Sequence, residues 1–414
     1  MGELPVGELL KSSAEAKLLP DSESPVRQRE ITFAEIINSR PGIDAIQQSD
    51  FAKHFCNKEV MHITQDDRSR FEYMFSWDII NRILSQNLLD EKRFRITRDG
   101  ADVPAGFFRD PTSERHPVNW AKVRDLLKQN ASLVMNRAHD LSPAVRRLAL
   151  QIEIALRHKV YVNGYMTFGS GGAFAMHYDP HDVLVLQIYG TKHWFVYEDP
   201  EPSPTYREKK KSTKPAPREV AFETVLQAGD ALFVPRGHYH RAAVTDTDSV
   251  HLTFGIHTAR VMDFVDWVKD ELLTDEAFRK DIVTLEGNDA VDAQDRAIKE
   301  RLCEIINGSS IWDYLAGREK LKSVSQVRLG PGAEIHENTL LSPLLRYAEA
   351  YSRTLQKSGK QPSPEIEKIL AFMLENPVST AGEIRRGIEN VLDQDALNST
   401  LAELVNDCWI EIIR

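Results

Sequence analysis

Two strand-forming stretches joined by a short turn restrict the fold of this chain more than any other feature. Residues 182–189 (DVLVLQIY) are a nearly continuous apolar run, which is typical of a strand buried on both faces. The run ends at Gly190-Thr191, and residues 192–197 (KHWFVY) form the next strand-like stretch. The dipeptide therefore predicts a tight hairpin turn between two strands, the first of which lies inside the domain.

Further short β-stretches lie on both sides of this pair. Residues 160–167 (VYVNGYMT) alternate large and polar side chains as a half-buried strand does, and residues 169–172 (GSGG) make a flexible turn. Residues 231–234 and 249–256 complete the set. Such a series of short strands predicts a double-stranded β-helix, the jelly-roll barrel.

Three potential metal ligands, His177, Asp179 and His240, stand where these strands begin or end. Two imidazoles and one carboxylate form a facial triad that holds Fe(II) and leaves the opposite positions open for a cosubstrate and oxygen. A histidine-x-aspartate tripeptide also occurs by chance in many proteins. Antiparallel pairing in a barrel can nevertheless bring the tripeptide close to His240, so we predict an iron site there.

Alternative readings of the same residues stay open at this point. His181 and His238 are close enough in sequence to replace a ligand, although a loop histidine is more often solvated or hydrogen-bonded. The barrel can also persist without iron, as a degenerate relative of metal-binding barrels. His193 and His251 are expected to be packing residues, and Trp194 is expected in the core.

Residues 160–257 resemble the JmjC domain of the ribosomal oxygenases, which are cupin-type protein hydroxylases dependent on Fe(II) and 2-oxoglutarate. The matching stretches are residues 163–167, 177–179, 182–183, Gln187, 190–194, 229–230, 234–237, His240 and 251–253. The order and spacing of these blocks cover the whole barrel.

The resemblance implies a role for each matching site residue. His177, Asp179 and His240 correspond to the iron ligands, and Lys192 corresponds to the residue that binds the far carboxylate of 2-oxoglutarate. The positions of Thr167 and Asn163 line the cosubstrate pocket in that family, and the position of Tyr165 lies near the substrate. A departure from the family pattern occurs at His238, where a bulkier aromatic or apolar residue is usual.

Elementary electrostatics supports the role of Lys192. The far carboxylate of 2-oxoglutarate would lie deep in the barrel, where an unpaired charge is costly. Lys192 offers the compensating ammonium, but only as a point charge, so a second donor such as the hydroxyl of Thr167 is expected. The alternative is a solvated lysine in a turn.

The chain is long enough for two or three domains at 414 residues. We expect an α+β protein with a flexible lead over residues 1–28, the JmjC/cupin oxygenase domain with helical bracing over 29–257, and mainly helices over 258–359. Helix starts are predicted at Ser76 and Ser142 within the bracing, and helices over 261–268 and 290–306 after the barrel. The resemblance implies that residues 258–359 form a homodimer, whereas helical apolar stripes alone more often mark a simple core.

Residues 360–414 read as a small winged helix, with helix starts at Ser363, Ser379-Thr380 and Asp393 and a terminal strand over 409–413. Residues 361–414 contain ten acidic and four basic side chains, the wrong sign for binding phosphates. We therefore expect a structural or protein-contact module, and nucleic acid is an unlikely partner. The insert over 199–218, with its lysines, reads as a solvated loop that alternatively guards the barrel mouth or contacts an acidic substrate.

Composition places the chain in a broad class without adding function. The formal charge of −10 and the isoelectric point near 5.8 argue against a general polyanion binder. Cys56, Cys303 and Cys408 are far apart and lack metal-site spacing, which favours a reducing compartment. With neither a membrane span nor a secretory signal in view, the cytoplasm is the expected location.

Three functional hypotheses follow. The first is an Fe(II)- and 2-oxoglutarate-dependent dioxygenase that uses O2 to hydroxylate a protein side chain, with a ribosomal protein as the substrate suggested by the resemblance. The second is the same chemistry on a biosynthetic peptide or on N-methyl-lysine, because demethylation begins as hydroxylation of a methyl group. The third is a noncatalytic cupin scaffold.

Overall fold

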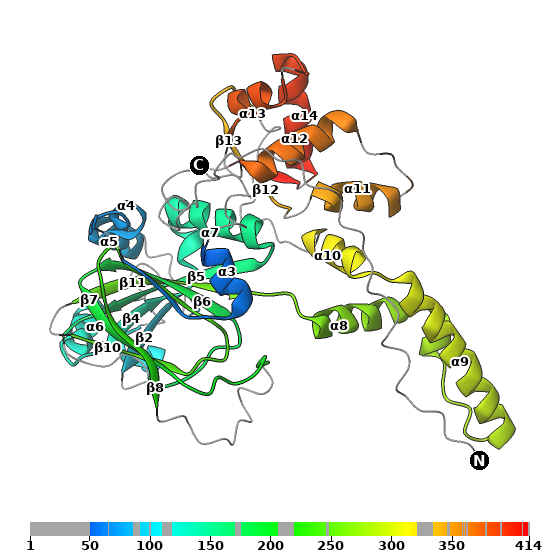
Figure 1. The fold of residues 1–414 in the computed structure, drawn as a ribbon, viewed down its shortest axis with the longest axis horizontal. Helices are drawn as coiled ribbons and strands as arrows, with labels where there is room; N and C mark the ends of the chain where they lie inside the picture. Colours follow the sequence, from blue (N-terminus) through cyan, green and yellow to red (C-terminus); the bar gives the residue numbers. More distant parts are fainter. Residues whose placement is uncertain are drawn as a thin grey trace, which may run out of the picture. The chain divides into compact units, whose positions relative to one another are not determined.

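Two antiparallel sheets organise the barrel in the computed structural model of the chain (Figure 1). The larger sheet has eight strands in the order β1-β9-β6-β11-β5-β4-β2-β3, and the smaller has three in the order β10-β7-β8. The structure describes residues 50–64, 66–85, 92–98, 101–109, 118–169, 175–205, 219–245, 248–320, 334–345, 348–357, 359, 361, 363–376, 379–389, 391–407 and 409–412. The lead predicted over residues 1–28 and most of the insert predicted over 199–218 lie outside these residues.

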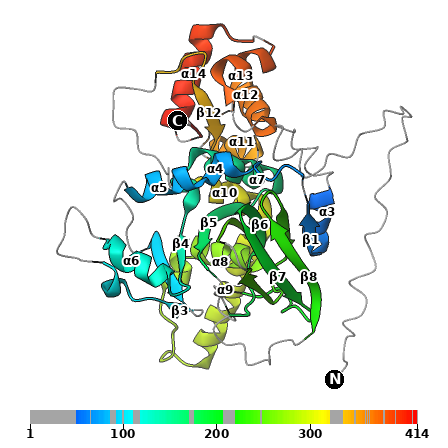
Figure 2. The same ribbon diagram turned by 90° about the vertical axis from the view of Figure 1, so that its left-hand side faces the viewer.

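The strands of the barrel and their bounds are β1 (Met61–Ile63), β2 (Phe94–Arg98), β3 (Ala101–Asp102), β4 (Ser132–Met135), β5 (Lys159–Thr167), β6 (Asp182–Tyr189), β7 (Thr191–Tyr197), β8 (Val220–Gln227), β9 (Ala231–Val234), β10 (His240–Val244) and β11 (Ser249–His257). The two sheets surround a common interior, which Figures 1 and 2 show from two directions. The jelly-roll prediction is confirmed, including strands β5, β6, β7, β9 and β11. Strands β8 and β10 were not predicted, since their alternation is broken by charged and small residues.

Strand β6 shows why its sequence is apolar on both faces. Val183 and Val185 belong to the core between the two sheets, together with Trp194 of β7. Leu184 and Leu186 belong to a larger core on the opposite face of the same strand. Successive side chains of a strand point to opposite faces, so a strand between two cores needs apolar residues at every position.

Helices cover the outer face of the large sheet. They are α3 (Asp50–Asn57), α4 (Glu72–Phe75), α5 (Trp77–Ser85), α6 (Trp120–Leu127) and α7 (Pro143–Leu156). The predicted caps of two of them are confirmed, since Ser76 Oγ accepts from the Ile79 N–H at 3.4 Å and Ser142 Oγ accepts from the Val145 N–H at 3.5 Å. These helices bury their apolar faces in the same core as Leu184 and Leu186.

The turn at Gly190 has a different role from the hairpin predicted for it. Strand β6 pairs with β9 and β11 in the large sheet, whereas β7 pairs with β8 and β10 in the small sheet. The hairpin prediction is therefore wrong, because the chain crosses here from one sheet to the other. Gly190 has a φ of +66°, and a Cβ at this position would lie 1.8 Å from the backbone oxygen of Asp248. Both a hairpin and a sheet-to-sheet corner require such a tight turn, so the local pattern does not separate them.

The chain is helical directly after the barrel, as predicted, but the region 258–359, for which helices were expected, also contains the strand β12 (Leu340–Pro343). This segment contains α8 (Val261–Leu272), the 3₁₀ turn η3 (Glu276–Arg279), α9 (Asn288–Gly308) and α10 (Ile311–Lys320). Helix α9 has 21 residues, and none of them is buried. Its apolar residues therefore do not form a simple core within the described chain.

The carboxyl-terminal part contains helices packed with a three-stranded sheet in the order β13-β12-β14. Its elements are β12 (Leu340–Pro343), α11 (Ala348–Lys357), α12 (Pro364–Glu375), β13 (Ser379–Thr380), α13 (Ala381–Gly387), α14 (Gln394–Asn406) and β14 (Ile410–Ile412). Ser363, Thr380 and Asp393 each accept a hydrogen bond from a first-turn N–H, so the three predicted helix starts are confirmed. No helix in the described part of the chain is both long and apolar enough to span a membrane.

Candidate metal centre and cosubstrate pocket

Backbone pairing brings two of the three predicted ligands, His177 and His240, next to each other. The His177 N–H donates to the His240 carbonyl at 3.0 Å, and the His240 N–H donates to the His177 carbonyl at 2.7 Å. Two residues further along, the Asp179 carbonyl accepts from the Gly237 N–H at 2.9 Å. Residues that are 63 positions apart in the sequence therefore become direct neighbours where β10 begins.

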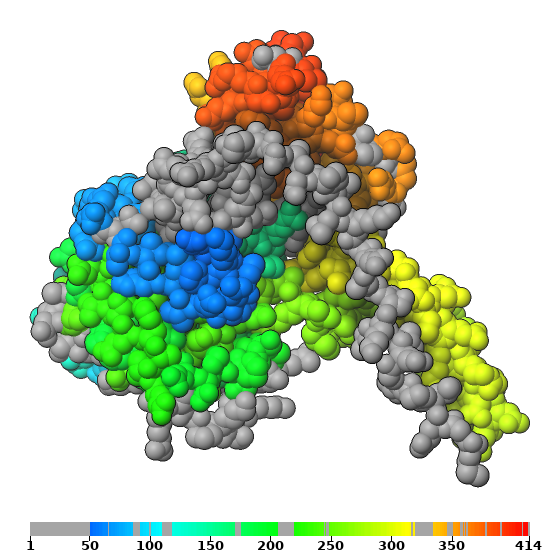
Figure 3. All heavy atoms as spheres, viewed as in Figure 1, coloured from blue at the N-terminus to red at the C-terminus, as the bar shows by residue number. Residues whose placement is uncertain are grey.

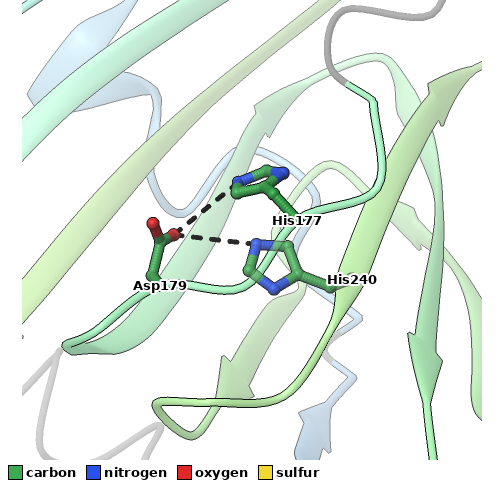
Figure 4. A group of neighbouring side chains, drawn as sticks. All are labelled: His177, Asp179 and His240. Atoms are coloured by element: carbon green, nitrogen blue, oxygen red, sulfur yellow. Dashed lines mark ion pairs between the residues drawn. The ribbon is translucent and has the colours of Figure 1, made fainter. Parts of the chain in front are cut away.

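The three side chains converge on one small volume (Figure 4). Asp179 Oδ2 lies 3.8 Å from His177 Nε2 and 3.7 Å from His240 Nε2. One ligand atom from each residue lies within 4.8 Å of the other two, which is close enough for all three to bind a single metal ion. Among the described residues, no other group of three or more His, Cys, Asp or Glu side chains is arranged so that it could hold a metal ion.

Second hydrogen bonds orient both imidazoles toward this point. His177 Nδ1 lies 2.9 Å from the Ala175 carbonyl, and His240 Nδ1 lies 3.0 Å from the His238 carbonyl. A carbonyl oxygen can only accept, so each Nδ1 carries a hydrogen, and in the neutral imidazole each Nε2 then has a lone pair that can bind a metal. Neutral imidazoles beside a carboxylate are the ligands that Fe(II) accepts. The donor set therefore fits the predicted ion.

The competing histidines do not join this group. His181 instead stacks on His257, with ring centroids 4.5 Å apart and ring planes 14° apart. His238 contributes its backbone carbonyl to the orientation of His240 rather than an imidazole to the cluster. The alternative ligand assignments are thus not supported by the geometry.

Lys192 lies inside the barrel and not in a solvated turn, since its residue is 1% exposed. Its Nζ lies 3.5 Å from Thr167 Oγ1 and 3.5 Å from His251 Nδ1. Within the described residues no carboxylate forms an ion pair with it. Burial lowers the pKa of Lys192 from 10.5 to about 7, because water no longer solvates the ammonium. A buried cation with only neutral neighbours is suited to receive an anion from outside the chain.

The side chains around Lys192 come from the opposite sheet. Thr167 is fully buried near the end of β5 and accepts a hydrogen bond from Ser132 Oγ of β4 at 3.0 Å. Asn163 lies four residues earlier on β5, and its side-chain oxygen accepts a hydrogen bond from the Arg137 N–H at 3.1 Å. Asn163 also hydrogen-bonds to Tyr165, whose pKa is raised mainly by burial and secondly by Asp179. Lys192 therefore bridges the small sheet and the large sheet at the position of Thr167.

Two residues expected to serve only in packing line the space between Lys192 and the metal centre. His251 contacts Lys192, stacks on Tyr165 with centroids 4.9 Å apart, and meets the edge of Trp194 at 5.9 Å. Trp194 in turn lies 6.0 Å from the ring of His240, and its indole Nε1 is buried without a hydrogen-bond partner among the described residues. Lys192 and burial both lower the pKa of His251, burial more strongly, so this imidazole is neutral.

A sequence signal for His251 did exist, because it is a polar residue within an otherwise apolar strand (SVHLTFGI). The pairing of β11 with β6 also shifts register between Val250 and His251. The residue left without a partner at this shift is Ile188 of β6, whereas His251 keeps a regular register with Tyr165 of β5. By contrast, His193 is partly exposed and pairs with Glu223 at 2.8 Å on the small sheet.

Fold and site together define a jelly-roll barrel with a candidate mononuclear metal centre and a buried cationic anchor. Residues 137–264 match the family model for the JmjC domain. This segment is therefore similar to a JmjC domain, and the resemblance to the JmjC ribosomal oxygenases drawn from the sequence is confirmed.

Curated relatives include proteins named bifunctional lysine-specific demethylase and histidyl-hydroxylase NO66. The protein from Aedes aegypti is 24% identical over 242 residues, a match that covers 54% of this chain and 34% of that protein. The protein from Dictyostelium discoideum is 26% identical over 220 residues, covering 49% of this chain and 40% of that protein. The match therefore spans well under half the length of these relatives.

Solved structures of the Escherichia coli ribosomal oxygenase YcfD have the same fold. One X-ray structure superposes with a TM-score of 0.54 at 15% identity and covers 88% of this chain and 97% of YcfD. Another, with the same TM-score, identity and coverage of this chain, contains YcfD in complex with cobalt and 2-oxoglutarate. At this identity the likeness shows the fold, including elements beyond the barrel.

Proposed function

We propose that this chain is an Fe(II)- and 2-oxoglutarate-dependent dioxygenase that hydroxylates a side chain of a protein. One observation carries the proposal: a buried lysine without a carboxylate partner among the described residues lies in the same barrel as a His-Asp-His cluster. A metal site alone is compatible with many reactions. The additional cation demands an anionic ligand, and a dicarboxylate can reach the metal with one end and Lys192 with the other.

Each group has a residue to hold it. His177, Asp179 and His240 would bind the iron, and Lys192 with Thr167 would bind the far carboxylate of 2-oxoglutarate. When bound, iron and 2-oxoglutarate supply the oxidising power that activates O2, with succinate and CO2 as coproducts.

The remaining side chains bind, orient and exclude water. Lys192, whose pKa of about 7 leaves it partly neutral at physiological pH, would hold the carboxylate of the cosubstrate in its charged ammonium form. Thr167 keeps its oxygen near that ammonium because Ser132 donates to it. His251 and Trp194 lie between Lys192 and the metal centre and present only neutral surface there. The attraction between the Lys192 ammonium and a bound carboxylate is therefore little weakened by polar surroundings.

Tyr165 and Asn163 are proposed to line the pocket beside this path. Their mutual hydrogen bond and the stacking of Tyr165 on His251 hold both side chains in place. We propose Tyr165 as a substrate-side residue and Asn163 as a cosubstrate-side residue, in keeping with the family positions that they match.

The direct test combines cosubstrate turnover with intact mass. Purified protein, loaded anaerobically with Fe(II), should convert 2-oxoglutarate to succinate in the presence of a substrate, and the product should gain one oxygen atom. Ribosomal proteins are the first class to test, because the family includes ribosomal oxygenases. Asp179→Ala removes activity in this proposal, whereas the matched variant His193→Ala, on the small sheet and outside the cluster, retains it.

Other outcomes identify the competing functions. Loss of a methyl group from the substrate identifies demethylation of N-methyl-lysine, an activity that the names of the curated relatives also include. Oxidation of a short biosynthetic peptide in place of a folded protein identifies a peptide-tailoring enzyme. Failure to turn over 2-oxoglutarate with any partner, despite bound iron, favours a noncatalytic scaffold.

We also propose that the helices after the barrel, residues 258–359, form a homodimer. Exposed apolar side chains gather there, at Val261, Met262, Ile282, Leu285, Ile306, Ile311 and Trp312. In Figure 3 the atoms of α9, coloured yellow, lie on the surface along the helix. A helix with no buried residue in one chain gains a core when a second copy packs against it.

Light scattering after size exclusion tests this assembly. The protein should elute as a dimer, and Ile306→Glu with Ile311→Glu should convert it to a monomer because a charge is unfavourable in an apolar interface. Lys280→Glu, an exposed substitution in the same segment, should leave the dimer unchanged. A monomeric parent protein refutes the proposal.

We propose that residues 29–257 form the oxygenase domain and residues 360–414 a winged helix that contacts protein rather than nucleic acid. We propose a cytoplasmic location, with which the exposed free thiols of Cys56 and Cys303 agree.

A further inference from the structure

A cavity lies in the carboxyl-terminal part of the chain, between α11, α12, α14 and the residue Trp409 that precedes β14. It encloses about 490 Å³, within the usual range for a ligand site. All the residues that line it belong to positions 351–409, so it shares none with the metal centre or with Lys192. The cavity is therefore separate from the proposed oxygenase site.

The lining of this cavity has one sign of charge. Glu365, Glu403 and Asp407 line it, and among the described residues no Lys, Arg or His does. Glu365 accepts a hydrogen bond from Ser363 at 2.6 Å, but Glu403 and Asp407 form no ion pair with any described residue. The cavity therefore attracts a cation.

The placement of Glu403 and Asp407 is unfavourable for the helix itself. They are four residues apart at the carboxyl-terminal end of α14, so they repel each other on one face. The helix dipole is also negative at this end, which disfavours acidic side chains. A bound cation would offset both effects.

An aromatic pair forms another wall of the cavity. The rings of Tyr351 and Trp409 meet edge to face, with centroids 5.1 Å apart and planes at 84°. Tyr351 is 6% exposed and lines the cavity. The pKa of Tyr351 is raised by burial first and then by Glu403 and Asp407, which places these carboxylates in its surroundings. Tyr351 is thus a largely buried aromatic residue that lines the cavity beside the two carboxylates.

The combination of carboxylates, aromatic rings and aliphatic side chains identifies the class of ligand. Leu355, Ile366 and Leu392 also line the cavity and can pack against a hydrocarbon stem. Aromatic faces and carboxylates together bind a guanidinium or an ammonium group. Among the described residues no metal-binding cluster occurs here, and the volume far exceeds that of a single ion. We propose that this cavity binds an arginine or lysine side chain of a basic polypeptide segment.

Fluorescence anisotropy with a labelled peptide of alternating arginine and glycine tests the site in the full-length protein. The double variant Glu403→Gln/Asp407→Asn should weaken binding by about tenfold or more, because the cation loses both counter-charges. The matched double variant Glu375→Gln/Glu389→Gln changes the net charge equally, on exposed residues of the same part of the chain that do not line the cavity. It should bind the peptide within about twofold of the parent protein, as expected for exposed charges away from the contact.

Two further measurements decide the specificity of the interaction. A peptide with citrulline in place of arginine has the same shape without the charge and should not bind. Tyr351→Phe should weaken binding of the arginine peptide if the phenol is one of its partners, whereas a merely structural role for this ring leaves the affinity unchanged. Equal losses in both double variants, or equal binding of the citrulline peptide, would overturn the proposal.

One additional variant shows whether the metal centre in the barrel contributes to peptide binding. Asp179→Ala should bind the arginine peptide as the parent protein does, since the metal centre contributes no residue to this cavity. Loss of succinate formation with intact peptide binding therefore reports on the oxygenase alone. The reverse pattern reports on the cavity alone.

Discussion

Replacing Lys192 by methionine should stabilise the protein and abolish cosubstrate binding at the same time. Methionine has a similar length and no charge, so it fills the space between β7 and the residues Thr167 and His251. In the parent protein, folding moves the lysine pKa from 10.5 to about 7. This change corresponds to a penalty of roughly 4 kcal/mol at pH 7, as an upper bound.

The increase in the free energy of unfolding on replacing Lys192 by methionine should be smaller than this upper bound. Buried charges in proteins relax their surroundings, and replacing them with apolar groups of similar volume typically yields about 1–3 kcal/mol. For a domain of this size, that gain corresponds to an increase in Tm of roughly 3–8 °C. The control Lys122→Met alters an exposed lysine on α6 and should leave the Tm within about 1 °C, since surface changes have small effects.

The pH dependence has a defined sign. The pKa of Lys192 is lower in the folded state than in the unfolded state, so the folding penalty is absent above pH 10.5, grows as the pH falls, and is complete below about 7. The stability advantage of Lys192→Met should therefore shrink between pH 7 and pH 9.5. The bound falls over this interval from roughly 4 to roughly 1.5 kcal/mol.

Thermal unfolding with and without ligands measures both halves of the prediction. The parent protein with redox-inert Mn(II) should gain about 3 kcal/mol more when 2-oxoglutarate is present at a hundredfold excess over its Kd. Lys192→Met should gain only the contribution of Mn(II). The reasoning fails if the variant is less stable than the parent at pH 7, if its advantage does not depend on pH, or if 2-oxoglutarate still stabilises it.

Three other substitutions test separate parts of the structure. Asp179→Ala should abolish succinate formation and leave the circular dichroism spectrum unchanged, and activity with iron supplied would refute the ligand assignment. Thr167→Val should weaken 2-oxoglutarate binding by about five- to tenfold, because Ser132 and Lys192 lose a buried hydrogen-bond acceptor. Thr167→Ser keeps the hydroxyl and should keep the affinity. Equal affinities of the valine and serine variants in calorimetry would show that Thr167 does not contribute to the pocket. Gly190→Ala should cost about 2 kcal/mol or more in the free energy of denaturant unfolding, because φ is +66° and the Cβ would meet the Asp248 carbonyl. Gly106→Ala, with no atom within 4 Å of the new Cβ, is its control, and similar values for both variants would contradict the steric argument.

The local pattern predicted the helix starts and most barrel strands correctly because their causes are local. Ser142 caps a helix through a hydrogen bond to a residue three positions away, and proline at the next position is already bent for the first turn. Strand β6 is apolar on both faces, which its sequence shows directly. The triad was predictable for another reason, since its chemistry requires rare residue types at strand ends.

Strand partners were beyond the reach of the local pattern. The residues at Gly190 predicted a hairpin, but β6 and β7 pair in different sheets. A tight turn reports only that the chain reverses or bends, whereas pairing depends on strands that are distant in sequence. The same holds for His251 of β11, whose contact with Lys192 of β7 joins strands of two different sheets.

By itself, the sequence determined which residues are able to bind iron and a dicarboxylate, and roughly where strands and helices begin. Only the tertiary structure decided that His177 and His240 pair through their backbones, that Lys192 is 1% exposed, and that an acidic cavity lies beside Tyr351. The physical reason is that ligand chemistry belongs to each side chain, whereas burial, pKa and convergence depend on what the rest of the chain places around it.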